Sequence, residues 1–133
     1  KKTKRWVATT LAHVAVVKNI KNAMGSKTPE KVFYYHYKHD PAGEVNNYAY
    51  EVLNIAHHTE MEDFDENAFV IYRPIYESSV YKLGAYWDAR PLTMFMERVV
   101  KDGKEMDRFT KITDPATVSV LEKIRDKMYE NFY

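Results

Sequence analysis

The chain has 133 residues, of which 45% are hydrophobic and 29% charged, and its formal net charge at pH 7 is +1. This length fits one domain with a single core, and the composition is that of a folded protein rather than a disordered one. The chain has no cysteine, which excludes disulfides, a thiolate nucleophile and a cysteine-based zinc site and agrees with the cytoplasmic location that we expect.

Charge is unevenly distributed along the sequence. Residues 1–29 carry seven Lys or Arg and no acid, whereas residues 60–66 carry five acids and no base. The basic segment suits contact with nucleic acid, although a solvated helix face explains it equally. No apolar run approaches the about 20 residues of a membrane span, and Thr9, Thr10 and His13 interrupt the stretch that resembles a signal peptide. We therefore expect no membrane partner.

Residues 5–24 are predicted to form a helix, because apolar residues recur at three- and four-residue spacing. Gly25 stands where a left-handed cap ends a helix. Such a helix suits the open end of a barrel, and a nucleic-acid arm or a partner-binding helix is the alternative. The apolar stripe consists of Val7, Leu11, Val14, Val17, Ile20 and Met24.

Short strands are predicted over residues 32–38, 48–57, 68–76 and 80–87. Pro74 makes the end of the third strand an edge or a bulge, and Gly84 bends the fourth. Alternation in the first strand places Tyr34, His36 and Lys38 on one face. In the second strand, it places Leu53 and Ile55 on one face and Val52 and Ala56 on the opposite face.

The last third of the chain is predicted to form a short turn, a hairpin, a strand and a helix. Residues 91–95 form the turn or a 3₁₀ piece, and Asp102-Gly103 marks the hairpin over residues 99–104 because it tolerates positive φ. The returning strand covers residues 107–112. Asp114 followed by Pro115 begins the helix with an N-cap and a proline at the first helical position. The apolar stripe of this helix is Val118, Leu121, Ile124, Met128 and Phe132.

This order of elements predicts a mainly β fold, a small barrel or roll flanked by an N-terminal and a C-terminal α-helix. We expect one domain over residues 1–133, with a helical extension (1–31), a β-roll core (32–113) and the final helix (114–133). The eleven tyrosines suit strands or a contact surface.

Several motifs in the middle of the chain resemble the bacterial family called domain of unknown function 1653, over roughly residues 33–112. They are Tyr34-x-His36-Tyr37-Lys38, Tyr50-Glu51-Val52-Leu53-x-Ile55-Ala56-x-His58-x-Glu60, Val70-x-Tyr72-Arg73, Arg90-Pro91-x-x-Met94-Phe95, Val99-x-x-Asp102-Gly103 and Arg108-Phe109. The resemblance implies an SH3-like β-roll and a bacterial or phage source. Asn54 stands where the family usually has glycine. His57 stands where it usually has arginine, which removes the basis for an anion contact there.

The matched segments hold the polar and aromatic residues that we predict to form a ligand site. Arginine and lysine suit phosphate or carboxylate groups, and tyrosine rings stack on planar ligands. Alternation puts His57 and His58 on opposite faces unless the strand ends between them. The alternative is an internal polar network that satisfies buried backbone groups, in which Arg90 ties down the loop before Pro91. The predicted site residues are His36, Tyr37, Lys38, Glu51, His58, Glu60, Tyr72, Arg73 and Arg90.

The sequence favours a non-catalytic binding module for a nucleic acid, a nucleotide or another anionic ligand, without a cofactor. The first alternative is a protein–protein adaptor, self-associating or not, that uses the tyrosine-rich surface and the terminal helices. The second is a small hydrolase-type enzyme in which Glu51 or Glu60 orients His58, although nothing marks a nucleophile or an oxyanion hole. No metal is expected, because the candidate ligands lack a recognised spacing. Those candidates are His36, His39, Asp40, His57 and His58.

Overall fold

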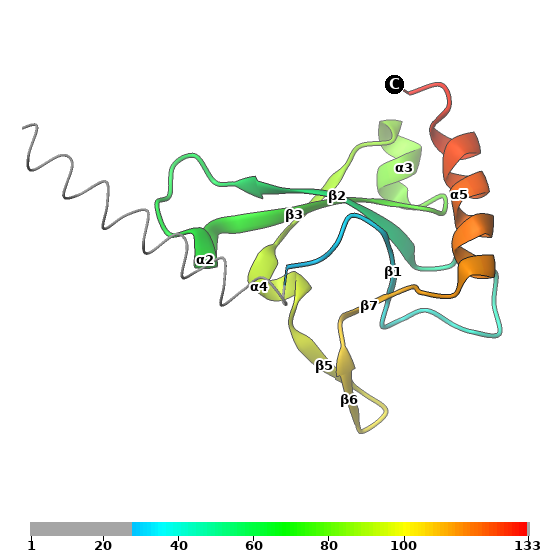
Figure 1. Cartoon of the computed structure of the whole chain (residues 1–133), viewed down its shortest axis with the longest axis horizontal. Helices are drawn as coiled ribbons and strands as arrows, with labels where there is room; N and C mark the ends of the chain where they lie inside the picture. Colours follow the sequence, from blue (N-terminus) through cyan, green and yellow to red (C-terminus); the bar gives the residue numbers. More distant parts are fainter. Residues whose placement is uncertain (1–27, 133) are drawn as a thin grey trace, which may run out of the picture.

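The computed structural model describes residues 28–132 (Figure 1), and the predicted helix over residues 5–24 lies outside them. The described chain is mainly β, as predicted. Its strands are β1 (Phe33–His36), β2 (Ala49–His57), β3 (Ala68–Pro74), β4 (Asp88–Pro91), β5 (Arg98–Lys101), β6 (Lys104–Asp107) and β7 (Phe109–Lys111). Its helices are α2 (Phe64–Asn67), α3 (Ser79–Gly84), α4 (Leu92–Phe95) and α5 (Pro115–Tyr129).

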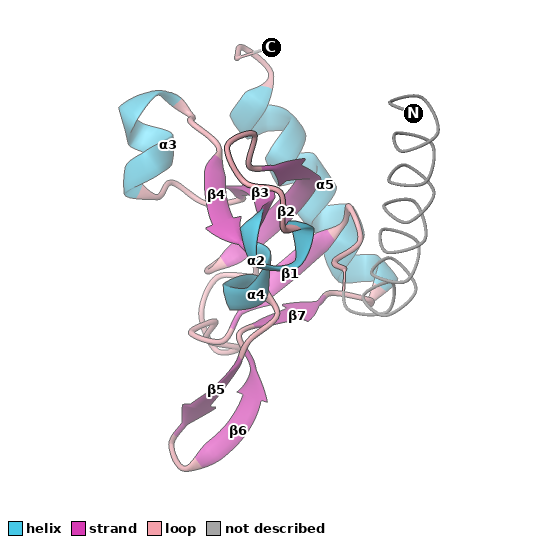
Figure 2. Ribbon diagram, turned by 90° about the vertical axis from the view of Figure 1, so that its left-hand side faces the viewer, coloured by secondary structure: helices cyan, strands magenta, loops and turns pink. Residues whose placement is uncertain are grey.

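Five strands form one antiparallel sheet in the order β4-β3-β2-β1-β7, and β5 and β6 form a separate hairpin. The hairpin projects away from the sheet (Figures 1 and 2). Because β4 and β7 stay at opposite edges of the sheet, it is open, so the predicted mainly β class is confirmed and the structure is not a closed barrel. The chain segment between these two edges forms the projecting hairpin instead of strands that would join them.

Helix α5 covers one face of the sheet, and we call the residues packed there the helix-side cluster. Leu121 of α5 is completely buried in it, and the Tyr129 hydroxyl donates to the Pro74 carbonyl oxygen over 2.6 Å. The Asp114 side chain accepts the Thr117 backbone N–H over 3.0 Å, which confirms the predicted start of the helix. The cluster comprises Phe33, Ala49, Ile75, Ala85, Ile112, Leu121 and Tyr129.

A second cluster, the open-side cluster, lies on the opposite face. Helix α4 supplies Leu92 and Phe95, and the Phe95 ring stacks on Phe109 at a centroid distance of 4.1 Å. Beyond α4, the same face carries half-buried polar side chains, and no helix of residues 28–132 covers them. The cluster comprises Tyr34, Val52, Ala68, Val70, Tyr72, Leu92, Phe95 and Phe109.

A β-bulge changes the predicted faces of β2. The register against β3 shifts between Val52 and Asn54, so Leu53 has no partner in the ladder. Val52 and Ile55 consequently pack on the same open-side cluster, whereas the sequence placed them on opposite faces. Leu53 is only half-buried and Val52 is 1% exposed, so Val52 is the core residue of this stretch.

The predicted fourth strand over residues 80–87 is wrong, because residues 79–84 form helix α3. The Ser78 hydroxyl accepts the Tyr81 backbone N–H at the helix start, and Ala85 closes its end with a φ of 56°. These caps override the strand preference of Val80 and Tyr81. The strand that follows, β4, and the single turn α2 were not predicted.

The predicted hairpin is confirmed, with positive φ at both Asp102 (53°) and Gly103 (75°). The predicted returning strand over residues 107–112 is divided between β6 and β7, which belong to different sheets. Residues 28–132 contain no helix with the length and apolarity needed to cross a bilayer.

Candidate functional site

Each strand of the five-stranded sheet contributes one side chain to a group on the open face, which we call the cross-strand site. Its floor is the Phe109 ring of β7. The ring centroids of His36 (β1), Tyr50 (β2) and Tyr72 (β3) lie 5.1, 5.8 and 5.6 Å from that of Phe109. The guanidinium carbon of Arg90 (β4) lies 5.7 Å from the same centroid. The site is thus built from residues that are up to 73 positions apart in the sequence.

Strand register explains why β4 presents two charged groups here. Tyr72 pairs with Asp88 and Val70 pairs with Arg90, so Asp88 and Arg90 lie on the face of the open-side cluster. Arg90 Nε donates to the Tyr72 hydroxyl over 3.0 Å. Burial raises the pKa of Asp88, and the nearby Arg90 opposes this effect.

His36 lies at the centre of a group of cations. Burial lowers the pKa of His36 most, the positive charges of Arg90, Lys38, Arg108 and Lys101 act in the same direction in decreasing order, and together they bring it to about 4. The imidazole is therefore neutral at pH 7. Its Nδ1 accepts the Lys38 backbone N–H over 3.2 Å, so the ring proton sits on Nε2 and is free to be donated.

These cations are poorly neutralised by the protein. Arg90, Lys38 and Lys101 form no ion pair with a carboxylate of residues 28–132. Lys101 Nζ donates to the Tyr37 carbonyl oxygen over 3.2 Å. A terminal nitrogen of Arg108 lies 3.5 Å from a Glu97 oxygen. The buried Nε of Arg108 has no hydrogen-bond partner among residues 28–132. Positive charge therefore accumulates around a neutral histidine.

Tyrosines form the other wall of the site. The hydroxyls of Tyr50 and Tyr76 are hydrogen bonded to each other, and burial raises the pKa of Tyr50, Tyr72 and Tyr76. All three remain neutral phenols at pH 7. The Tyr48 ring is 37% exposed and stacks beside His36 at a centroid distance of 5.7 Å.

The structure brings five of the nine predicted site residues together. Tyr37, whose ring lies 4.4 Å from that of His36, and Lys38 follow directly after β1. Tyr72 and Arg90 complete this group through their hydrogen bond.

Glu51 and Arg73 lie on the opposite face, under α5, and do not join the cross-strand site. Arg73 Nε donates a hydrogen bond to Glu51 Oε1 over 2.9 Å, and a terminal nitrogen of Arg125 donates one to Glu51 Oε2 over 2.8 Å. The Arg73 guanidinium lies 4.1 Å from the centre of the Tyr129 ring. The predicted internal polar network describes these residues well.

His58 and Glu60 lie at the far end of β2, roughly 25 Å along the strand from Tyr50. His58 Nδ1 accepts the Glu60 backbone N–H over 3.2 Å, and the Glu51 carboxylate is occupied by two arginines. The arrangement in which Glu51 orients His58 is therefore absent. Residues 28–132 also hold no group of three or more His, Asp or Glu side chains arranged to bind a metal ion.

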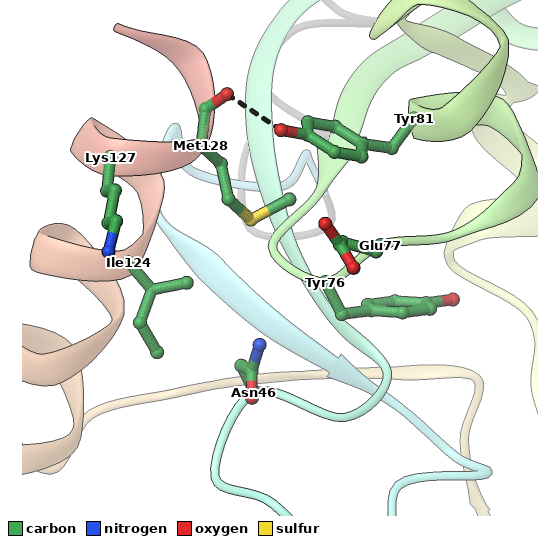
Figure 3. Close-up of a pocket in the computed structure, with 7 residues that line it drawn as sticks. All are labelled: Asn46, Tyr76, Glu77, Tyr81, Ile124, Lys127 and Met128. Atoms are coloured by element: carbon green, nitrogen blue, oxygen red, sulfur yellow. Dashed lines mark hydrogen bonds between the residues drawn. The ribbon is translucent and has the colours of Figure 1, made fainter.

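A pocket of about 500 Å³ lies between α5 and α3 (Figure 3) and shares Tyr76 with the cross-strand site. The Tyr81 hydroxyl donates to the Met128 carbonyl oxygen across one side of it, over 3.0 Å. One acid and one base line this pocket, so it lacks the excess positive charge of the cross-strand site. Its lining residues are Asn46, Tyr76, Glu77, Tyr81, Ile124, Lys127 and Met128.

Comparison with protein-family models gives one match, to the model described as "Protein of unknown function (DUF1653)", over residues 32–111. The chain belongs to this family. The match confirms the resemblance inferred from the sequence motifs, and no curated protein and no solved structure matches the chain. The DUF1653 region contains all strands from β1 to β7, and with them the whole cross-strand site, whereas α5 and its Arg125 lie beyond it.

Seven residues of the cross-strand site were not predicted from the sequence as site residues. Tyr50, Arg108 and Phe109 belong to motifs of the DUF1653 resemblance, so the motifs carried a signal for them. Asp88 was missed because the predicted fourth strand ended before it. The complete set of missed residues is Tyr48, Tyr50, Tyr76, Asp88, Lys101, Arg108 and Phe109.

Proposed function

We propose that this DUF1653 domain is a non-catalytic module that binds an anionic ligand at the cross-strand site. One observation carries the proposal: four cations surround a neutral, half-buried His36, and three of them have no carboxylate partner among the described residues. Partial burial of these cationic side chains without a counter-ion costs free energy, and a bound anion would offset that cost.

The available donors suit a phosphate or carboxylate group. Arg90 uses only its Nε in the hydrogen bond with Tyr72. Both terminal nitrogens of the guanidinium therefore remain available for a bidentate contact with an oxyanion. His36 Nε2–H and the Lys38 ammonium add further donors from the end of β1. Half-burial of the site strengthens each contact relative to open water, where unit charges 4 Å apart attract by only about 1 kcal/mol.

A titration followed by NMR amide shifts tests the proposal, with inorganic phosphate and ribose 5-phosphate as probes. We expect shifts to concentrate at the end of β1 and in β4, and affinity to fall as salt rises. Arg90→Ala should weaken binding at least tenfold. Arg98→Ala is the matched control, since it removes the same charge from the exposed hairpin, where Arg98 already pairs with Glu105 and Asp107.

If Arg90→Ala and Arg98→Ala weaken phosphate binding equally, binding depends only on net charge, which would contradict a defined site. Absence of saturable binding by both probes would also overturn the proposal.

A protein–protein adaptor is the second candidate, because large apolar side chains are exposed close together around the end of α3. Leu83, Tyr86 and Trp87 are 74%, 65% and 52% exposed. Light scattering at increasing protein concentration, in low and in high salt, tests self-association of this kind. An apolar contact predicts a mass that rises with concentration and changes little with salt, whereas a constant monomer mass would remove the self-associating form.

A further inference from the structure

We propose that the anionic ligand is a nucleoside phosphate whose base stacks on Tyr48 and donates N–H groups to Asp88. This inference rests on the proposed anion site and names the class of molecule that fits it. It depends on the polarity of the site, on one unpaired carboxylate and on one exposed aromatic ring.

The cross-strand site has two ends of opposite charge. Lys38 follows His36 by two residues and Lys101 Nζ donates to the Tyr37 carbonyl oxygen, whereas Asp88 lies opposite Tyr72 in the pairing of β4 with β3. Arg90 reaches both ends, because it affects His36 as well as Asp88. A simple anion would use only the first end. A ligand that carries an anionic group and, some distance away, a hydrogen-bond donor would use both.

The Asp88 carboxylate is half-buried, yet it has no hydrogen bond or ion pair with any of residues 28–132. A carboxylate in such a place loses solvation without gaining a donor in return. Two oxygens of one carboxylate can accept two parallel N–H groups. Among the common bases, guanine presents a ring N–H beside an amino group on one edge, so it matches this acceptor best.

Tyr48 supplies the surface on which a base can stack. Its φ of 52° is in the left-handed region, which is unfavourable for a bulky side chain. The His36 backbone N–H donates to the Tyr48 carbonyl oxygen over 3.0 Å and helps to hold this conformation. The Tyr48 ring centroid lies 5.7 Å from that of His36 and 5.7 Å from that of Tyr76, and the residue is 37% exposed. A base can stack on such an exposed ring whatever its identity, because every base has a π-face.

Calorimetric titration of the full chain with GMP and with ribose 5-phosphate separates the base from the phosphate. The variants are Tyr48→Asn, which removes the ring and keeps a residue that tolerates positive φ, and Asp88→Asn, which keeps the shape and removes the charge. Tyr86→Ala is the control, because it removes an exposed tyrosine outside the site.

We expect the parent protein to bind GMP at least tenfold more tightly than ribose 5-phosphate, and more tightly than AMP or UMP. Tyr48→Asn and Asp88→Asn should each bring the GMP affinity close to that of ribose 5-phosphate, and Tyr86→Ala should change neither. Asp88→Asn should tighten the binding of ribose 5-phosphate, since it removes a negative charge from the site.

Equal affinities of the parent for GMP and ribose 5-phosphate would overturn the base-binding inference and leave the anion site standing. Retention of the full GMP preference in both variants would likewise overturn it. Absence of binding by either compound would overturn the anion site as well.

Discussion

The two faces of the sheet use arginine in opposite ways. On the helix side, Arg73 and Arg125 hold both oxygens of Glu51, which is only 9% exposed, and α5 closes over them. On the open side, Arg90 donates to the Tyr72 hydroxyl and lies over the Phe109 ring, with no ion pair to any of residues 28–132. The same residue type therefore holds the fold together on one face and offers unused donors on the other.

This difference shows that a buried arginine is informative only together with its partners. Where the carboxylate and its cations satisfy one another, the group is explained by the fold, and removal of one member leaves an uncompensated charge. Where cations outnumber the acids beside them, their mutual repulsion needs another explanation, and a ligand anion supplies one.

The largest expected effect comes from breaking the helix-side network. Glu51→Ala removes the carboxylate from the Arg73 side chain, which is 13% exposed, and leaves Arg125 with its pair to Asp126, so it should lower the free energy of unfolding by about 3–5 kcal/mol. Urea denaturation measures it. Glu105→Ala, which breaks an exposed pair with Arg98, should cost at most about 1 kcal/mol. Similar costs for the two variants would contradict the contrast between a closed network and a surface pair.

A pair of leucine truncations tests which apolar residues hold the sheet to α5. Leu121 is fully buried in the helix-side cluster, so Leu121→Ala should cost about 2–5 kcal/mol. Leu53 sits at the bulge and is half-buried, so Leu53→Ala should cost clearly less. The same denaturation experiment ranks them, and a larger loss for Leu53→Ala would mean that the bulge is misplaced.

A smaller effect is expected from pH on the open side. His36 has a pKa of about 4 in the folded protein and about 6.5 when unfolded, so the unfolded state binds more protons between these values. Stability should therefore fall as pH is lowered from about 6.5 to about 4. Because solvent screens this half-exposed ring and the facing Arg90, Lys38, Arg108 and Lys101, we expect about 1 kcal/mol.

The free energy of unfolding is measured for the parent and for His36→Gln across that pH range. The difference between the two isolates the contribution of His36, because the titration of Asp88 contributes equally to both proteins. Parallel stability curves for the two proteins would show that His36 titrates normally, and that the cations do not act on it.

Local signals in the sequence predicted much of the fold. Alternation gave β1 and β2, Asp102-Gly103 gave the hairpin, and the Asp114 cap gave the start of α5. These features depend on neighbouring residues alone. The open sheet and the bulge at Leu53 depend on which strands pair across the fold, which no local pattern encodes.

The sequence likewise allowed only part of the cross-strand site to be predicted. Tyr72 and Arg73 are neighbours in a strand, and alternation alone requires them to face opposite sides. Grouping both in one site therefore contradicted a rule that the sequence already supplied. In contrast, the pairing of Glu51 with Arg125, 74 positions away, follows only from the docking of α5.

The most direct test of the contrast between the two faces is a comparison of Arg73→Ala with Arg90→Ala. For each variant, the free energy of unfolding and the affinity for ribose 5-phosphate are measured in the same buffer. We expect Arg73→Ala to lose about 3 kcal/mol or more of stability and to keep its affinity under conditions where it is folded. Arg90→Ala should lose at least tenfold in affinity and at most about 1 kcal/mol of stability. Equal loss of stability in both variants, with unchanged affinity in Arg90→Ala, would contradict this account.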